Sequence, residues 1–155
     1  LPNYCGTKAF SENETIAIRD YVKELTKNQT MKIYFAMHSY SQIWLFPYSY
    51  KEAATSKDDM YKKLAKNATD AIRKTHNVEY TYGQSYTAMY PCSGTSMDWI
   101  EVNNLANFTF TIELRDDGTL GFILPSKFIK PTAEENWNGI KAVIASFKNM
   151  SNIFG

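Results

Sequence analysis

The run MKIYFAM at residues 31–37 constrains the fold of this chain more than any other stretch of its sequence. Nearly every position in it is apolar, and several carry β-branched or aromatic side chains. A short run without alternation between apolar and polar residues is typical of a strand that is buried on both faces of a sheet. His38 follows directly, at the predicted carboxyl end of the strand, and ligands bind at that edge of open α/β sheets.

Amphipathic helices are predicted on either side of this strand. Residues 11–26 open with Ser11 and Glu14 in capping-box spacing. The apolar stripe that follows consists of Ile18, Val22 and Leu25. Residues 57–76 repeat apolar side chains at every fourth position, which predicts a second helix. That stripe consists of Met60, Leu64, Ala68 and Ile72.

The C-terminal part predicts further strands and a third helix. NFTFTIEL (107–114) and TLGFILP (119–125) are separated by the turn RDDG, a spacing that permits a hairpin. The helix is predicted to begin at PTAEE, where Thr132 and Glu135 repeat the capping-box spacing. Its apolar stripe consists of Trp137, Ile140, Ile144 and Phe147. The order helix, strand, helix, strands, helix indicates an α/β fold.

The composition is ordinary for a globular chain, with 44% hydrophobic and 21% charged residues. The net charge is +1, and lysine and arginine are spread along the sequence, so we expect no nucleic acid and no membrane among the partners. No apolar run approaches the ~20 residues that a membrane-spanning helix needs. A length of 155 residues fits one domain or a part of a larger one.

N-x-S/T sequons occur five times in the chain, which favours a secreted glycoprotein. They begin at Asn13, Asn28, Asn67, Asn107 and Asn149. The pattern often arises by chance, so a chain that is merely rich in Asn and Thr is the alternative. Asn107 runs into a predicted strand, which argues against glycosylation there. The cysteines, Cys5 and Cys92, could pair with each other, pair with cysteines outside the chain or stay free.

His38 and Glu113 are the first candidates for chemistry. A lone histidine is usually a surface or satisfied core residue, but one held at the end of a strand is a better ligand candidate. A catalytic zinc needs about three protein ligands, so His38 alone cannot make such a site. Glu113 lies in an apolar strand, where a carboxylate is costly unless it pairs, for instance with Arg115, or acts as a general base. His76 is at a predicted helix end, where an exposed histidine is favoured by the helix dipole.

Several long segments, taken in order, closely resemble the zinc metallocarboxypeptidases of the pancreatic carboxypeptidase A/B type. They are HSYSQ, LFPYSY, YPCSGTSMDW, FTIELRDDGTLGFILP and IKPTAEENW, and they extend over nearly the whole chain. Long motifs in the same order are far more specific than one short pattern. YCG near the start resembles the B-type subgroup. The resemblance implies an α/β fold, the C-terminal half of a mixed, mostly parallel twisted sheet flanked by helices.

The resemblance also implies roles for matching residues. His38, in HSYSQ, matches a zinc ligand. Glu113, in IELRD, matches the catalytic glutamate, which activates the attacking water and then passes the proton to the leaving amine. Tyr90, in AMYPCSG, matches a mobile tyrosine that closes over bound substrate, and Arg115 matches a position that we interpret as structural. Positions that line the substrate cleft are matched by Ser39, Tyr40 and Phe122.

Met97, in GTSMDW, matches the floor of the family's specificity pocket. An aspartate there accompanies removal of C-terminal Lys or Arg, whereas an apolar residue accompanies aromatic or aliphatic C-terminal residues. A methionine would leave a substrate cation unpaired, so we expect the apolar preference of the A-type enzymes. Simple core packing is the alternative interpretation of Met97. The other positions that match the pocket wall are Leu45, Ser49, Ser85, Cys92 and Thr111.

Residues 1–155 are similar to only the C-terminal part of the family's single catalytic domain, and its N-terminal part is absent from this chain. The family's other zinc ligands come from an HxxE segment in its N-terminal half, upstream of the position that His38 matches. The HxxE pattern in this chain, HNVE at 76–79, lies downstream of His38 and is therefore not that segment. We therefore expect poor zinc binding and no catalysis without the N-terminal half. In the B-type subgroup the YCG cysteine bonds to a cysteine slightly upstream, so Cys5 is a candidate tether to that half. Cys92 is expected to be free.

The function implied is that of a secreted zinc exopeptidase, which removes the C-terminal residue of peptides and proteins. A pro-segment that makes the precursor a zymogen is usual in the family. The alternative is a non-catalytic relative that keeps the fold and binds peptides without a complete zinc site. The presence of His38, Tyr90 and Glu113 favours the enzyme. The upstream sequence would discriminate, because HxxE together with a carboxylate-binding arginine indicates catalysis.

Overall fold

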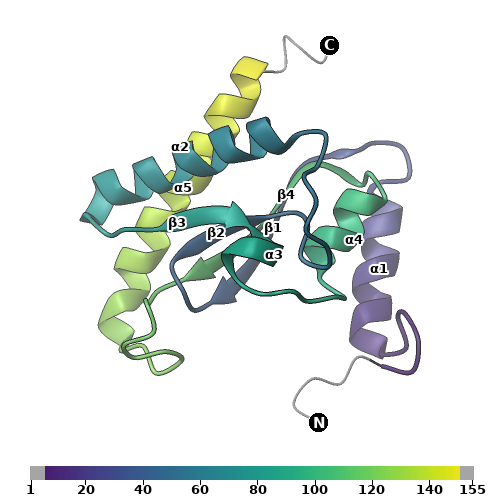
Figure 1. Ribbon diagram of the computed structural model, residues 1–155, viewed down its shortest axis with the longest axis horizontal. Helices are drawn as coiled ribbons and strands as arrows, with labels where there is room; N and C mark the ends of the chain where they lie inside the picture. Colours follow the sequence, from purple (N-terminus) through teal and green to yellow (C-terminus); the bar gives the residue numbers. More distant parts are fainter. Residues whose placement is uncertain (1–5, 151–155) are drawn as a thin grey trace.

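A four-stranded mixed sheet lies at the centre of the computed structural model, which describes residues 6–150 and, at 148–150, the backbone alone (Figure 1). Its strands are β1 (Met31–Ser39), β2 (Ile43–Phe46), β3 (Thr81–Gln84) and β4 (Ala106–Leu114). Their order is β1-β4-β2-β3. β1 is parallel to β4 and β2 is parallel to β3, whereas β4 and β2 are antiparallel. The predicted mixed, mostly parallel sheet is confirmed.

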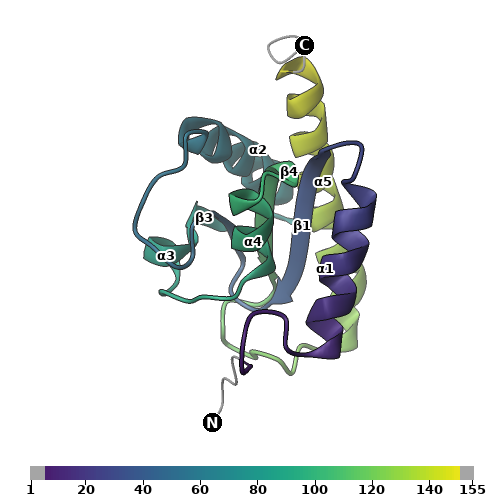
Figure 2. The same cartoon turned by 90° about the vertical axis from the view of Figure 1, so that its right-hand side faces the viewer.

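Helices lie on both sides of this sheet. α2 (Asp58–His76) and α5 (Ile129–Met150) pack on each other and cover one face (Figures 1 and 2). α4 (Ser96–Val102) contacts β4 and β1 on the opposite side, and α1 (Asn13–Leu25) lies beside α4. Two short elements, α3 (Ser85–Ala88) and the 3-10 turn η1 (Ser126–Phe128), complete the described part. None of the described helices is both long and apolar enough to cross a bilayer.

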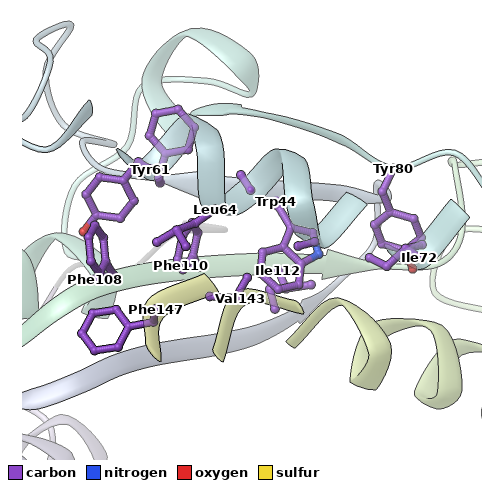
Figure 3. Close-up of a cluster of buried hydrophobic side chains, with 13 residues drawn as sticks. Trp44, Tyr61, Leu64, Ile72, Tyr80, Phe108, Phe110, Ile112, Val143 and Phe147 are labelled. Atoms are coloured by element: carbon purple, nitrogen blue, oxygen red, sulfur yellow. The ribbon is translucent and has the colours of Figure 1, made fainter. Parts of the chain in front are cut away.

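The core is an aromatic and aliphatic cluster between the sheet, α2 and α5 (Figure 3). β4 supplies Phe108, Phe110 and Ile112, each at most 1% exposed. Tyr61 of α2 lies edge-on to Phe110 with ring centroids 5.3 Å apart, and Phe147 of α5 lies edge-on to Phe108. Burying each large side chain of this kind stabilises the fold by about 1.5–3 kcal/mol. This cluster fixes β4, the central strand that carries Glu113.

The two helices predicted at 11–26 and 57–76 both form. α2 spans nearly the predicted range, and Leu64, Ala68 and Ile72 of its stripe are fully buried. α1 also forms, but the predicted capping box at its start is wrong. The helix begins at Asn13, no side chain caps it, and Ser11 Oγ donates to the Glu12 carboxylate instead. Of the α1 stripe only Val22 is buried, and the exposed members are Ile18 at 53% and Leu25 at 40%.

The start and the buried face of α5 also differ from prediction. α5 begins at Ile129, directly after η1, so Thr132 lies inside the helix and the predicted capping box is wrong. Trp137 is 57% exposed and Ile144 is 39% exposed, although both belong to the predicted buried stripe. The buried face instead includes Glu135, which is 0% exposed. Glu135 binds Arg115 at the end of β4, and of the predicted stripe Ile140 and Phe147 do pack against the core.

The strand predicted at 119–125 does not form. The Asp116 carboxylate accepts hydrogen bonds from the backbone amides of Gly118, Leu120 and Gly121 at 2.7–3.0 Å. These bonds curl the segment into a loop, and the amides are no longer available to a neighbouring strand. The apolar FILP run is therefore largely exposed, with Ile123 at 85%.

β1 forms where it is predicted, but it is less covered than a strand buried on both faces. It is the edge strand of the described sheet and pairs with β4 alone. Ala36, at 8% exposed, is the one buried residue of β1, whereas Met37 is 49% exposed. Part of the apolar surface of β1 therefore has no cover within residues 6–150.

Candidate active site

The carboxyl ends of β1 and β4 bring His38 and Glu113 together. The two strands are parallel, and His38 is the register partner of Glu113. Paired residues of neighbouring strands point to the same face of a sheet. The His38 Nδ1 atom lies 3.7 Å from Glu113 Oε1, which is longer than a hydrogen bond. The two side chains therefore face one space at the edge where α/β proteins bind ligands.

The environments of these two side chains differ strongly. The His38 side chain is 56% exposed, whereas that of Glu113 is 10% exposed. Burial raises the pKa of the Glu113 carboxyl above its ordinary value, and the charge of nearby His38 opposes that shift. A carboxyl with a raised pKa at an open sheet edge is suited to taking up and releasing a proton.

This edge of the sheet supplies only some of the ligands that a zinc ion needs. Neutral imidazole is a common ligand of zinc, and the exposed ring of His38 fits that donor chemistry. Within the described ranges, no group of three His, Cys, Asp or Glu side chains could hold an ion. Residues 6–150 can thus offer one imidazole to a metal, with Glu113 beside it.

An aromatic pair lies directly after the carboxyl end of β1. The Tyr40 ring, directly after β1, meets the Phe122 ring edge-on with centroids 4.9 Å apart. Gly121 has a φ of 59°, and a Cβ on it would lie 3.2 Å from the Tyr40 ring, so a side chain there would crowd Tyr40. Ser39 and Phe122 line a groove of about 560 Å³ beside this pair. The structure thus brings three of the predicted cleft residues together.

The predicted pocket-wall residues gather around the segment that follows β2. Ser49 is fully buried, and its carbonyl accepts from the Cys92 amide at 3.0 Å. The neighbouring Tyr48 carbonyl accepts from the amide of Tyr86, the residue after Ser85. In the sheet itself, Leu45 is the register partner of Thr111. Three separate chain segments therefore meet at this one wall.

Tyr90 lies on the segment between α3 and α4, and Met97 lies in α4 itself. Met97 is 1% exposed in the first turn of α4, so it is packed within this part of the molecule. Tyr90 follows α3 and is 60% exposed. As an exposed loop residue, Tyr90 is less constrained by packing than the buried residues of the wall. Cys92 is a free thiol, and burial raises its pKa.

Asp98 is a structural residue of this wall that the sequence interpretation missed. Its carboxylate accepts from the Ser49 amide at 3.0 and 2.9 Å and from the Tyr50 amide at 3.2 Å. Thr95 Oγ1 caps α4 by accepting from the Asp98 amide at 3.2 Å. Burial raises the pKa of Asp98, although these hydrogen bonds oppose the shift. The spacing of Thr95 and Asp98, which resembles a capping box, was the available signal.

Arg115 does not pair with Glu113, which was the ion pair considered for Glu113. Its guanidinium binds Glu135 of α5 instead, with Nε donating to Oε1 at 2.7 Å and Nη2 donating to Oε2. The other histidine, His76, is at the end of α2, exposed as expected, and lies 3.2 Å from Glu134. Cys5 is outside the described residues.

Comparisons with known proteins agree with this arrangement. The family model described as zinc carboxypeptidase matches residues 1–139. The chain is 38% identical over 144 residues to carboxypeptidase B of Astacus astacus, covering 93% of this chain and 46% of that protein. It is 38% identical over 141 residues to carboxypeptidase A1 of Bos taurus, covering 91% of this chain and 33% of that protein.

Solved structures give the same result. Bovine thrombin-activatable fibrinolysis inhibitor, solved in complex with tick carboxypeptidase inhibitor, matches with a TM-score of 0.88 at 35% identity. That match covers 94% of this chain and 49% of the other. The chain therefore spans half or less of the length of these relatives. Because one family model extends over most of the chain and the folds superpose, the chain belongs to the zinc carboxypeptidase family.

Proposed function

We propose that this chain is the C-terminal part of a peptidase catalytic domain that removes the C-terminal residue of peptides and proteins. The observation that carries the proposal is the juxtaposition of His38 and Glu113, 3.7 Å apart at the carboxyl edge of the sheet. Membership of the zinc carboxypeptidase family supports the assignment of the cofactor as zinc. The proposal treats residues 1–155 as one part of one domain, active only together with the N-terminal half.

The proposed chemistry divides between the two side chains. Zinc, when bound, polarises a carbonyl and lowers the pKa of water. His38 would hold the ion through its exposed imidazole, and the remaining ligands would come from the N-terminal half. Glu113 takes a proton from the attacking water and delivers it to the leaving amine. Its burial supports this role, because it raises the pKa of the carboxyl toward the range in which a base can also act as an acid.

We propose substrate contacts for the residues around this centre. Tyr90, exposed in a loop, closes over the bound peptide and donates a hydrogen bond to it. Ser39, Tyr40 and Phe122 contact the peptide beside the metal. Met97, with the wall residues around Ser49, receives the C-terminal side chain. Because Met97 is apolar, the proposed preference is for aromatic and aliphatic C-terminal residues.

The N-terminal half would cover a surface that is open in this chain. The groove beside Tyr40 continues along α5 and β1, and its apolar lining includes Met37, Phe122, Ile129 and Trp137. Two buried polar atoms at this groove, Thr132 Oγ1 and Asn136 Oδ1, have no hydrogen-bond partner among the described residues. An apolar surface with buried acceptors of this kind is typical of an interface that lacks its partner. Cys5 is the proposed tether.

The test is to supply the N-terminal half from a relative. The part of Astacus astacus carboxypeptidase B that precedes the matched region is fused to this chain, and zinc content and hydrolysis of a peptide ending in Phe are measured. We expect about one zinc per molecule and turnover. The variant Glu113→Gln should keep the zinc and lose roughly 10²–10⁴-fold in turnover. Turnover that survives in this variant would contradict the role of Glu113.

A second candidate function remains open to the same test. Zinc bound without turnover, or peptide binding without zinc, would favour the non-catalytic peptide-binding relative. The edge-on contact of Tyr40 with Phe122, which is 79% exposed and lines the groove, is the observation that supports peptide binding by itself, since aromatic side chains at a groove suit peptide contacts.

We also propose that the protein is secreted and carries N-glycans. The exposure of each sequon in the fold determines which asparagines are glycosylated. Asn28 and the two residues after it are exposed in the turn before β1, and Asn13 is exposed at the start of α1. Asn67 Nδ2 instead donates to Ser146 Oγ at 2.9 Å between α2 and α5. The side chain of Asn149 lies outside the described residues.

Secretion from a eukaryotic host and removal of N-glycans by glycosidase test this proposal. We expect a mass shift that Asn28→Gln reduces and that Asn67→Gln leaves unchanged. No shift in the parent protein would contradict glycosylation altogether.

A further inference from the structure

A buried polar cluster lies just beyond the end of β4, in an otherwise apolar part of the molecule. It consists of Arg115, Glu135, Tyr80 and Asn136. The Glu135 carboxylate receives the Arg115 guanidinium on both oxygens and accepts from Tyr80 Oη at 3.2 Å. Asn136 Nδ2 donates to Tyr80 Oη at 3.0 Å. Glu135 is 0% exposed, and the Arg115 side chain is 11% exposed.

Stability alone does not explain such a cluster. The desolvation of two buried charges offsets most of their attraction, and well-packed apolar residues of similar volume are often as stable or more stable. A two-pronged Arg–carboxylate contact fixes the direction and distance of both groups more tightly than an apolar contact does. The cluster is therefore suited to fixing the relative position of the two chain segments that it joins.

The position of Arg115 in the chain shows that one of these segments is the end of β4, which carries Glu113. Glu113 is the second-last residue of β4, and Arg115 is the first residue after the strand. The Leu114 carbonyl between them accepts from the Ser41 amide at 3.1 Å and from the Gln42 amide at 3.2 Å, both on the turn after β1. In residues 6–150 the Glu113 carboxylate accepts no hydrogen bond, so its place depends on the backbone of this strand end.

We propose that the Arg115–Glu135 pair is a positioning device for Glu113. It attaches the end of β4 to α5 and thereby fixes the Glu113 carboxylate relative to His38, while Tyr80 and Asn136 orient Glu135. The inference rests on the proposed function, in which Glu113 is the base. Displacing a reacting group by about 1 Å can reduce a rate roughly 10²-fold, so an attachment of this kind matters for catalysis.

The test uses the fused protein described above and a matched pair of variants. Glu135→Gln removes the charge that holds Arg115, and Glu134→Gln is the control. Glu134 is the neighbouring residue on α5, is 45% exposed and contacts His76 and Lys130 on the surface. For Glu135→Gln we expect kcat to fall by about 10–100-fold with KM unchanged. The control should leave both constants unchanged, and an unchanged kcat in Glu135→Gln would overturn the proposal.

A double variant separates positioning from stability. Arg115→Met with Glu135→Leu leaves no unpaired buried charge, so its thermal stability should exceed that of Glu135→Gln alone. If the pair positions Glu113, kcat stays low in the double variant. Recovery of kcat together with stability would mean that the pair is only structural.

Hydrogen exchange gives a readout that requires neither turnover nor zinc. In Glu135→Gln the amides of Ser41 and Gln42, which bind the Leu114 carbonyl, should exchange faster, while the Phe110 amide within β4 should not change. Unchanged exchange at Ser41 and Gln42 would overturn the attachment itself. This result is independent of the proposed function, whose failure would appear as an inactive parent fusion.

Discussion

The face of the sheet under α2 and α5 and the edge at β1 differ in how completely they are covered. Under the helices, Leu64 and Phe110 are fully buried in a cluster to which the sheet, α2 and α5 all contribute. At the edge, Met37 of β1 is 49% exposed, and Tyr21 of nearby α1 is 70% exposed. The first region is a finished core, whereas the second has apolar surface that no residue among 6–150 covers. The candidate site lies where the two regions meet, because His38 is on the edge strand β1 and Glu113 is buried on the neighbouring central strand β4.

The largest expected effect contrasts one residue from each region. Phe110→Ala should lower the free energy of unfolding of the isolated chain by about 3–5 kcal/mol, because it leaves a cavity in the finished core. Ile18→Ala, at an α1 position that is 53% exposed, should change it by less than about 0.5 kcal/mol. Urea denaturation followed by circular dichroism measures both. Similar losses for the two variants would remove the distinction between the regions.

A smaller effect is expected at the pocket near the open edge. Met97→Asp in the fused protein should shift the ratio of kcat/KM for C-terminal Arg over C-terminal Phe, on the order of 100-fold, because a buried carboxylate can pair with the substrate cation. Met97→Leu is the control, since it keeps the pocket apolar. The ratio is measured with a pair of peptides that differ only in the last residue. An unchanged ratio in Met97→Asp would assign Met97 to core packing.

The smallest expected effect concerns Cys92. Because burial raises the pKa of its thiol, less of it is the reactive thiolate at pH 8, and iodoacetamide should modify it more slowly than free cysteine. A ligand with a C-terminal Phe should slow the reaction further if Cys92 lines the pocket. Peptide mass spectrometry of timed samples measures both rates. Modification at the rate of free cysteine would show that this wall is more open than its hydrogen bonds indicate.

The finished core is also the region that the sequence predicted best. The stripe from Leu64 to Ile72 and the apolar run around Phe110 are local patterns, and a local pattern is enough when the whole face of an element is buried. Prediction failed where one polar side chain decides the structure. The Asp116 carboxylate holds 119–125 as a loop, and on α5 the residue that faces inward to bind Arg115 is Glu135, whereas Trp137 is 57% exposed. Neither interaction has a periodicity that a sequence shows.

The candidate site was likewise predicted only in part. His38 and Glu113 were predicted from motifs, and the pairing of β1 with β4 explains why they meet. β2 and β3 were missed because four residues each are too few for a pattern to emerge. The wall around Ser49 depends on those short elements and on Asp98, so its assembly could not be derived from local sequence.

The one-sided pairing of β1 has a consequence for how this protein must be made. Within the described residues, the outer edge of this nine-residue strand presents backbone donors and acceptors to any chain that approaches. The isolated chain should therefore associate with itself at high concentration, strand edge to strand edge. In a single polypeptide the N-terminal half would leave the ribosome first and could receive β1 as it emerges. Folding during synthesis would then protect the edge of β1 from aggregation. This protection is lost when the chain is produced alone.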